Sequence, residues 1–252
     1  MTETPLLLKT TMDIATPRVD DSSLTAHKTI RIADKEINTP PKALQVGKLR
    51  KSEDVVPLAR GIAETFTTAN DLKLTNSRTG EYSGLSDNLR LQAERANDDE
   101  VVVPFVKYEE TGTLSQENAK EIARLQTNYG DVLTVPLQTE LAYGADNGDG
   151  LDSKIVDVLI ENTQTYLRAV EDLQVNKPVM GVFPSISREV TDHLFNLYLD
   201  HGVRVFCVDF NRRTATAKAQ QDQVITPLMR SLLAEGLHEE SFIYAVNLKN
   251  GQ

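Results

Sequence analysis

The residues best suited to chemistry in this chain surround the end of one apolar segment, Val203–Phe210. Asp209 lies at its end, and Asn211, Arg212 and Arg213 follow. A carboxylate can act as a nucleophile or transfer protons, and a guanidinium binds phosphate or carboxylate through parallel hydrogen bonds. An acid, an amide and two arginines at a strand end are typical of the catalytic face of a (β/α) barrel. The alternative is ordinary ion pairing among them.

Two further polar side chains, Gln138 and Ser185, also follow predicted strands. The Gln138 amide carries a donor and an acceptor that match the edge of a purine, and a hydrogen bond to the backbone at the strand end is its other explanation. We therefore expect Asp209 to be the catalytic residue. We expect the substrate contacts to be Gln138, Asn211, Arg212, Arg213 and Ser185.

The sequence predicts no metal and no cofactor. Cys207 is the single cysteine, which excludes an intrachain disulfide and a Cys-based zinc site. We interpret it as a buried thiol inside an apolar strand. Asp146–Gly150 lacks the full ligand pattern of a calcium loop and is interpreted as a turn. No glycine-rich phosphate-binding pattern follows a predicted strand, which disfavours nucleotide cofactors.

Composition indicates an acidic globular protein. Its 252 residues are enough for one large α/β domain, and 27 Lys+Arg against 37 Asp+Glu give a formal net charge of −10. This balance disfavours a nucleic-acid binder, although a local basic patch is compatible with it. Neither a long apolar span nor the features of a signal peptide are present. We therefore expect a soluble, cytoplasmic protein that does not bind a membrane.

The elements that position these residues begin with an arm and a hairpin. Residues 1–28 show no sustained period, and we expect a flexible arm or an irregular cap there. Ile30, Ile32 and Ile37 are spaced about a polar turn at Asp34–Lys35, which predicts a β-hairpin.

After short strands predicted at 43–46 and 54–58, and a long loop predicted over 66–85, helices and strands alternate. Helices are predicted at 86–96, 113–125, 152–170, 187–198 and 225–237, and strands at 101–106, 131–137, 178–183, 203–210 and 242–248. Alternation with apolar strands predicts a parallel sheet.

Because polar residues recur just after these strands, we favour a (β/α) TIM-type barrel over a doubly wound sheet, with residues 29–252 as a single domain. The chain ends directly after the last predicted strand. This leaves two expectations open: a complete barrel, or an incomplete one whose exposed edge is covered by a second subunit or another copy of the chain.

Three segments occur in an order that resembles a known family. Ile32–Pro40 is similar to a hairpin that ends in Thr-Pro, and Leu114–Leu133 is similar to a helix followed by a Gly-Ser-Asp strand entry. Lys177–Arg213 is similar to a Met-Gly-Val strand followed by a strand that ends in Thr-Arg. These are motifs of the tRNA-guanine transglycosylase superfamily, barrel enzymes that exchange guanine for a deazaguanine. The family's Asp-Ser-Gly-Gly-Phe-Gln motif and its zinc-binding segment are absent.

The resemblance implies a queuine- or archaeosine-type guanine transglycosylase acting on tRNA or DNA. As a pentosyltransferase, a class of glycosyltransferase, it would work through a covalent intermediate on a carboxylate, with Asp209 as nucleophile and Gln138 near the base. The family's nucleophile falls nearest Cys207, and Asp209, two residues later, shares its strand face.

Two alternatives remain beside this hypothesis. One is a non-catalytic barrel subunit that binds nucleic acid or a partner chain. The other is an unrelated TIM-barrel enzyme acting on a phosphorylated metabolite, with Arg212 or Arg213 and backbone N–H groups around an anion. A pocket shared by Asp209 and Gln138 would favour an enzyme, and a pocket filled by Leu137 or Phe210 would favour the non-catalytic barrel.

Overall fold

The computed structural model describes residues 12–15, 18–19, 26–39, 42–48, 60–145, 151–214 and 216–248. The strand predicted at 54–58 and the turn predicted at Asp146–Gly150 lie outside these ranges, as does most of the predicted arm. No helix within them is both long enough and apolar enough to span a bilayer.

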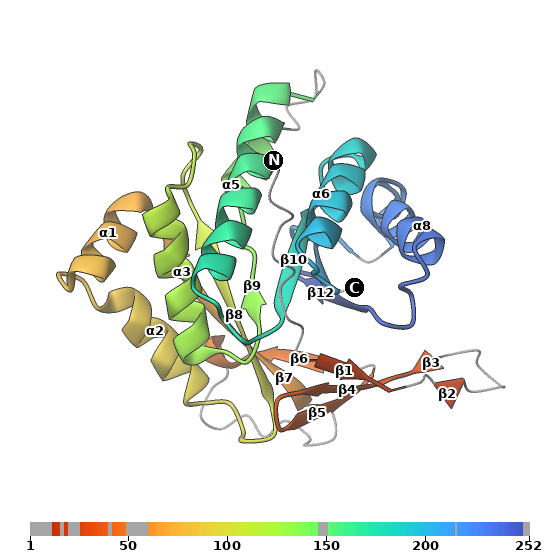
Figure 1. Ribbon diagram of the computed structural model, residues 1–252, viewed down its shortest axis with the longest axis horizontal. Helices are drawn as coiled ribbons and strands as arrows, with labels where there is room; N and C mark the ends of the chain where they lie inside the picture. The colour runs from red at the N-terminus through yellow and green to blue at the C-terminus, as the bar shows by residue number, and fades with distance from the viewer. Residues whose placement is uncertain are drawn as a thin grey trace.

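Two parallel sheets form the centre of the molecule (Figure 1). The first contains β6 (Lys42–Gln45), β7 (Arg60–Ala69) and β8 (Val101–Tyr108), and the second contains β9 (Leu133–Thr134), β10 (Val179–Pro184), β11 (Val205–Asp209) and β12 (Phe242–Val246). A parallel bridge between Lys107 and Leu137 joins them. The strands therefore follow one another in chain order, and no ladder pairs β12 with β6 in the described ranges.

From β7 onward, helices connect consecutive strands, as the alternation of the sequence predicts. They are α1 (Asp71–Thr79), α2 (Gly84–Ala93), α3 (Gln116–Tyr129), α4 (Thr139–Ala145), α5 (Ser153–Asp172), α6 (Arg188–Asp200), α7 (Lys218–Gln220) and α8 (Thr226–Ala234), with a 3-10 turn at Val46–Lys48 and a π-helical turn at Gln221–Ile225. The predicted α/β fold of the barrel type is confirmed, as an open arc of parallel strands with helices between them.

Side chains on the central strands alternate between a helix-facing layer and an interior layer. Phe183 of β10 packs edge-on against Tyr198 of α6, with ring centroids 5.2 Å apart. Its neighbour Val182 pairs in register with Cys207 of β11, so both face the other side, toward the interior. Asp209, two residues after Cys207, lies on that same face at the C-terminal end of its strand.

The predicted hairpin is confirmed as β4 (Thr29–Ile32) and β5 (Lys35–Asn38), with its turn one residue earlier than expected. β1 (Met12–Ile14) pairs with β4, and a separate small ladder joins β2 (Arg18–Val19) to β3 (Ala26–His27). Ile30, Ile32 and Ile37 are buried in the main core.

Two lysines tie this hairpin to the N-terminal ends of the central strands. Lys35 Nζ lies 2.7 Å from the carboxylate of Asp131, which precedes β9. Lys28 Nζ donates to the carbonyl oxygen of His238 at 2.7 Å, in the turn before β12. The hairpin is therefore at the end of the barrel opposite to the predicted catalytic face.

The predicted loop over 66–85 is wrong, because this segment continues β7 and then forms α1. Thr65 and Thr67 are buried in β7, where β-branched side chains fit a packed sheet. The Asn70 side chain accepts a hydrogen bond from the backbone N–H of Lys73 at 2.9 Å and so caps α1, and left-handed Gly80 ends it. The polar composition of residues 66–85 obscures both the strand and the helix caps in the sequence.

One hydrogen bond crosses the interior of the arc. The Tyr244 hydroxyl of β12 donates to the carboxylate of Glu64 on β7, and the Gln45 side chain of β6 also contacts this carboxylate. Phe105 of β8 stacks on Tyr244 with ring centroids 6.1 Å apart. Burial raises the pKa of Glu64 because the charged form loses its hydration.

We predict that Glu64→Gln flattens the dependence of stability on pH. A folded-state pKa above 4.5 means that the stabilisation from protonated Glu64 is complete below that value and is lost as the pH rises through the raised pKa. The free energy of unfolding of the variant, relative to wild type, should therefore increase between pH 4 and pH 8. Chemical denaturation across this range measures it.

Glu81→Gln, at an exposed glutamate, is the matched control and should leave the pH profile unchanged. A Glu64→Gln profile parallel to that of wild type would contradict the prediction.

Candidate active site

The carboxyl group of Asp209 is anchored through one of its two oxygens. Oδ1 accepts hydrogen bonds from the backbone N–H of Asn211 and from Nδ2 of Asn247, both at 2.9 Å. Within the described ranges no group donates to Oδ2. The side chain is buried, and burial raises its pKa while the two hydrogen bonds oppose the rise. One held oxygen and one available oxygen suit a group that transfers protons.

The two loops that flank this carboxyl contain backbone that non-glycine residues adopt reluctantly. Asn211, Arg212 and Asn247 have φ values of 46°, 61° and 56°. The carbonyl oxygen of Asn247 accepts a hydrogen bond from the backbone N–H of Arg212 at 2.8 Å, which links the end of β12 to the loop after β11. Such conformations cluster at functional sites, where the surrounding structure maintains them.

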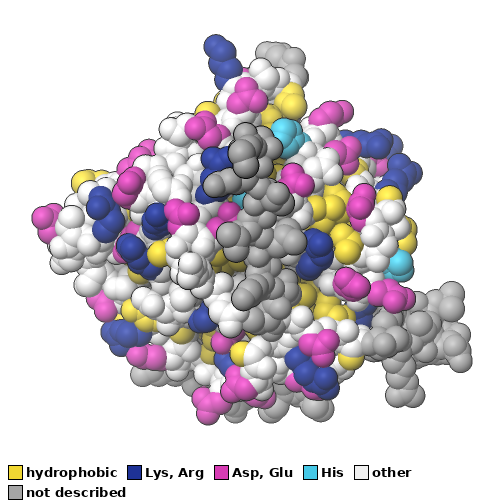
Figure 2. All heavy atoms as spheres, in the orientation of Figure 1, with side chains coloured by type: hydrophobic (Ala, Val, Ile, Leu, Met, Phe, Trp, Pro, Cys, Tyr) yellow, Lys and Arg dark blue, Asp and Glu magenta, His cyan; other side chains and the backbone are white. Residues whose placement is uncertain are grey.

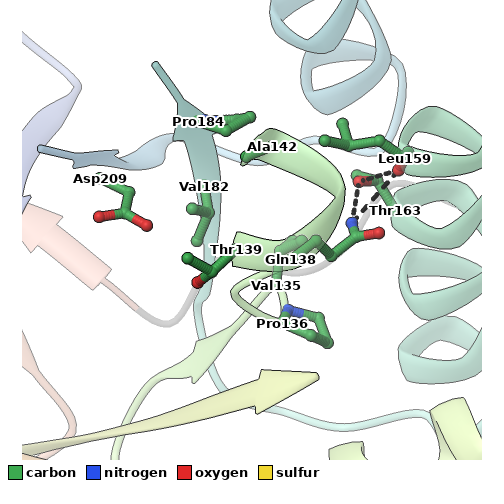
Figure 3. A pocket seen from close by; sticks show the side chains of 10 residues that line it. All are labelled: Val135, Pro136, Gln138, Thr139, Ala142, Leu159, Thr163, Val182, Pro184 and Asp209. Atoms are coloured by element: carbon green, nitrogen blue, oxygen red, sulfur yellow. Dashed lines mark hydrogen bonds between the residues drawn. The ribbon is translucent and has the colours of Figure 1, made fainter. Parts of the chain in front are cut away.

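A small cavity lies beside Asp209, among β10, α4 and α5 (Figure 3). Its polar lining consists of Gln138, Thr139, Thr163 and Asp209. Neither Leu137 nor Phe210 lines it. The volume is about 10 Å³, which is room for roughly one water molecule. Thus a carboxylate and hydroxyl groups surround a water-sized space. A larger molecule would have to approach Asp209 from outside the C-terminal ends of the barrel strands, which we call the mouth of the barrel.

The amide of Gln138 turns toward α5 in Figure 3, on the side away from Asp209. Its Nε2 donates to the Leu159 carbonyl oxygen at 3.2 Å and to the Thr163 hydroxyl at 3.3 Å. Its Oε1 accepts from Nδ2 of Asn162 at 3.0 Å. Both the nitrogen and the oxygen of the Gln138 amide are therefore hydrogen-bonded to α5, and this contact holds the helix against the end of the strand.

Ser185 and Arg213 lie together beside Asp209. Nη1 of Arg213 donates to the Ser185 hydroxyl at 3.1 Å, and that hydroxyl donates to Oε1 of the buried Gln220. Nε2 of Gln220 in turn lies 3.4 Å from the Asp209 carbonyl oxygen. A chain of hydrogen bonds thus joins the end of β10, the end of β11 and an arginine.

The backbone N–H groups of this loop are already occupied. Those of Arg212 and Arg213 bond to the carbonyl oxygens of Asn247 and Phe210, both at 2.8 Å. No carboxylate of the described chain pairs with either guanidinium. An anion at this site would therefore be bound by side chains rather than by the backbone N–H groups that the sequence led us to expect.

Helix α4 reaches across the mouth and was not predicted from the sequence. Its Tyr143 hydroxyl donates to Oδ1 of Asn211 at 2.8 Å, and its Glu140 lies 3.0 Å from Nζ of Lys107 at the end of β8. Sequence reasoning also assigned no role to Asn247 or Gln220. The position of Asn247 directly after a strand was the one available signal. No group of three metal-ligating side chains occurs in the described ranges.

No family model and no curated protein matches this chain. Solved structures with similar folds include 2,3-dimethylmalate lyase, described as a PEP mutase/isocitrate lyase superfamily member, with a TM-score of 0.38 at 9% identity over 74% of this chain and 75% of that one. Oxaloacetate acetylhydrolase has a TM-score of 0.37 at 12% identity over 73% of this chain and 68% of that one.

The predicted membership of the tRNA-guanine transglycosylase superfamily is wrong. No family model matches this chain, that of the transglycosylases included. The predictions of glycosyl transfer and tRNA modification, which depended on this membership, are therefore also wrong. The geometry gives a physical reason, because the Gln138 amide that was expected to contact a base is satisfied by α5. The segments that resembled the family are a hairpin, a helix and strand ends, which are common to many α/β folds.

We predict that Asn247→Gly raises the pKa of Asp209 further. Glycine keeps the left-handed backbone but removes the Nδ2 donor, which stabilises the charged carboxylate. Titration of the Asp209 carboxyl carbon by ¹³C NMR measures the shift, with Asp209→Asn to assign the signal.

Gln174→Gly is the matched control because Gln174 is exposed, also left-handed with a φ of 50°, and lies at the end of α5. It should leave the Asp209 titration unchanged. An unchanged or lowered Asp209 pKa in Asn247→Gly would show that this hydrogen bond does not tune the carboxyl.

Proposed function

We propose that this chain is an α/β-barrel enzyme that acts on a small phosphorylated metabolite, with Asp209 as the group that transfers a proton. The observation that carries the proposal is the carboxyl itself. It lies at the C-terminal end of a parallel strand, is 6% exposed, and has one oxygen anchored and the other available. This is the end of the barrel strands at which barrel enzymes carry out their chemistry.

The proton transfer follows from the environment of Asp209. As a carboxylate, its Oδ2 takes a proton from a C–H or O–H of the substrate, and the bonding electron pair stays on the substrate. Asp209 becomes a neutral acid, the form that its buried surroundings favour. Oδ1 keeps its two donors throughout, so the side chain does not reorient. Return of the proton to the product restores the carboxylate.

An anionic substrate is supported by Arg213 and Ser185. The guanidinium is positioned by the Ser185 hydroxyl and has no carboxylate partner in the described ranges. In a chain with a formal net charge of −10, unpaired guanidinium groups at a strand end favour binding of a phosphate.

The face of the molecule drawn in Figure 2 supports a small molecule rather than a nucleic acid as substrate. Figure 2 shows acidic and basic side chains interspersed over one face, with no continuous basic area among the coloured residues. A nucleic-acid site normally needs such an area, because neutralised phosphates supply much of the affinity.

The experiment that tests the proposal is a screen of phosphorylated metabolites by ³¹P and ¹H NMR. We expect turnover of at least one, and we expect Asp209→Asn to reduce kcat by roughly 10²- to 10⁴-fold with little change in binding. Arg213→Gln should instead raise KM, because the guanidinium binds ground state and transition state alike.

Arg168→Gln on the exposed side of α5 is the control for loss of one positive charge and should alter neither constant. Turnover that survives in Asp209→Asn, or that is confined to uncharged substrates, would rule the proposal out.

A further inference from the structure

Arg212 occupies a backbone conformation that its residue type does not favour. Its φ is 61°, in the left-handed region, where the Cβ atom crowds the following carbonyl group. Asn211 and Asn247, the left-handed residues beside it, are of a type that tolerates this region, and arginine is not. The loop therefore maintains arginine at a position where glycine would be the least strained choice.

The side chain of Arg212 contributes nothing visible to the fold. It is exposed, and its guanidinium forms no hydrogen bond or ion pair with any described residue. The interaction that matters for the loop is the backbone N–H bond to the Asn247 carbonyl at 2.8 Å, which glycine would keep. The strain is therefore not compensated by a contact of this side chain with a described residue.

We propose that Arg212 is the second guanidinium of an anion site with Arg213, and that the site takes a doubly charged phosphate monoester. This deepens the proposed function, since it names the charge of the group bound beside Asp209. Arg212 and Arg213 are consecutive in the chain, and neither guanidinium has a carboxylate partner in the described ranges. Two such guanidinium groups together would match a phosphate dianion better than a singly charged carboxylate. The left-handed turn at residue 212 keeps this arginine at the mouth at the expense of stability.

The test compares Arg212→Gly with Gln174→Gly, because both replace an exposed left-handed residue and only the first lies at the mouth. Relief of strain should raise the Tm of each variant by about 2 °C. Calorimetric titration with inorganic phosphate at low salt should show affinity weakened about tenfold or more in Arg212→Gly and unchanged in Gln174→Gly. Acetate should bind wild type more weakly than phosphate.

A fall in the Tm of Arg212→Gly would assign the side chain a structural role and overturn the inference. Phosphate affinity that is unchanged in this variant, or absent in wild type, would overturn it as well. Neither measurement involves turnover. A protein that binds phosphate through Arg212 but converts no metabolite would therefore retain this site and lose the proposed enzyme activity.

Discussion

The placement of the last strand is the constraint on which the candidate site depends. β12 pairs only with β11 among the described strands, and its Tyr244 reaches across the interior to Glu64 on β7. Directly after β12 comes Asn247, whose amide and carbonyl hold Asp209 and the loop after β11. The contact between Tyr244 and Glu64 holds β12 in place, and β12 in turn positions Asn247 beside the Asp209 carboxyl. A contact deep in the barrel therefore governs the geometry at its mouth.

The interior of this arc carries polar groups at some thermodynamic cost. Glu64 and Asp209 are both buried carboxyls whose pKa is raised by lost hydration, and Cys207 lies on the interior face of the strand that Asp209 ends. Burial and these two carboxylates raise the pKa of the Cys207 thiol, so it stays neutral and packs as a small apolar group. The Tyr244 hydroxyl donates a hydrogen bond to the buried Glu64 carboxyl and so offsets part of its lost hydration. By contrast, Oδ2 of Asp209 accepts no hydrogen bond from the described residues. That asymmetry distinguishes the carboxyl of Glu64 from that of Asp209, the group proposed to transfer a proton.

Backbone strain at the mouth agrees with the role proposed for Asp209. Three left-handed non-glycine residues lie beside one carboxyl. Asn211 and Asn247 donate hydrogen bonds to it, and the backbone N–H of Arg212 donates to the Asn247 carbonyl oxygen. A sequence optimised for stability alone would place glycine at such positions. Left-handed non-glycine residues also occur elsewhere, at Ala33 in the hairpin turn (φ 55°) and at Gln174 after α5 (φ 50°). The feature particular to the mouth is that three of them lie beside one buried carboxyl.

The sequence by itself determined most of the order of elements and the location of Asp209 at the end of a strand. Apolar runs such as Val101–Val106 and helical spacing after Asp152 depend on periods of two and 3.6 residues, which are local properties. It failed at 66–85, where buried threonines look like a loop, and at α4, where the apolar signal is short. Only the tertiary structure decided which polar side chains remain available. Gln138 and Ser185 are both polar residues that follow a strand. The amide of Gln138 is hydrogen-bonded to α5, whereas the hydroxyl of Ser185 accepts a hydrogen bond from Arg213. The physical reason is that hydrogen-bond partners distant in sequence, such as Asn247 for Asp209, are set by packing and not by neighbouring residues.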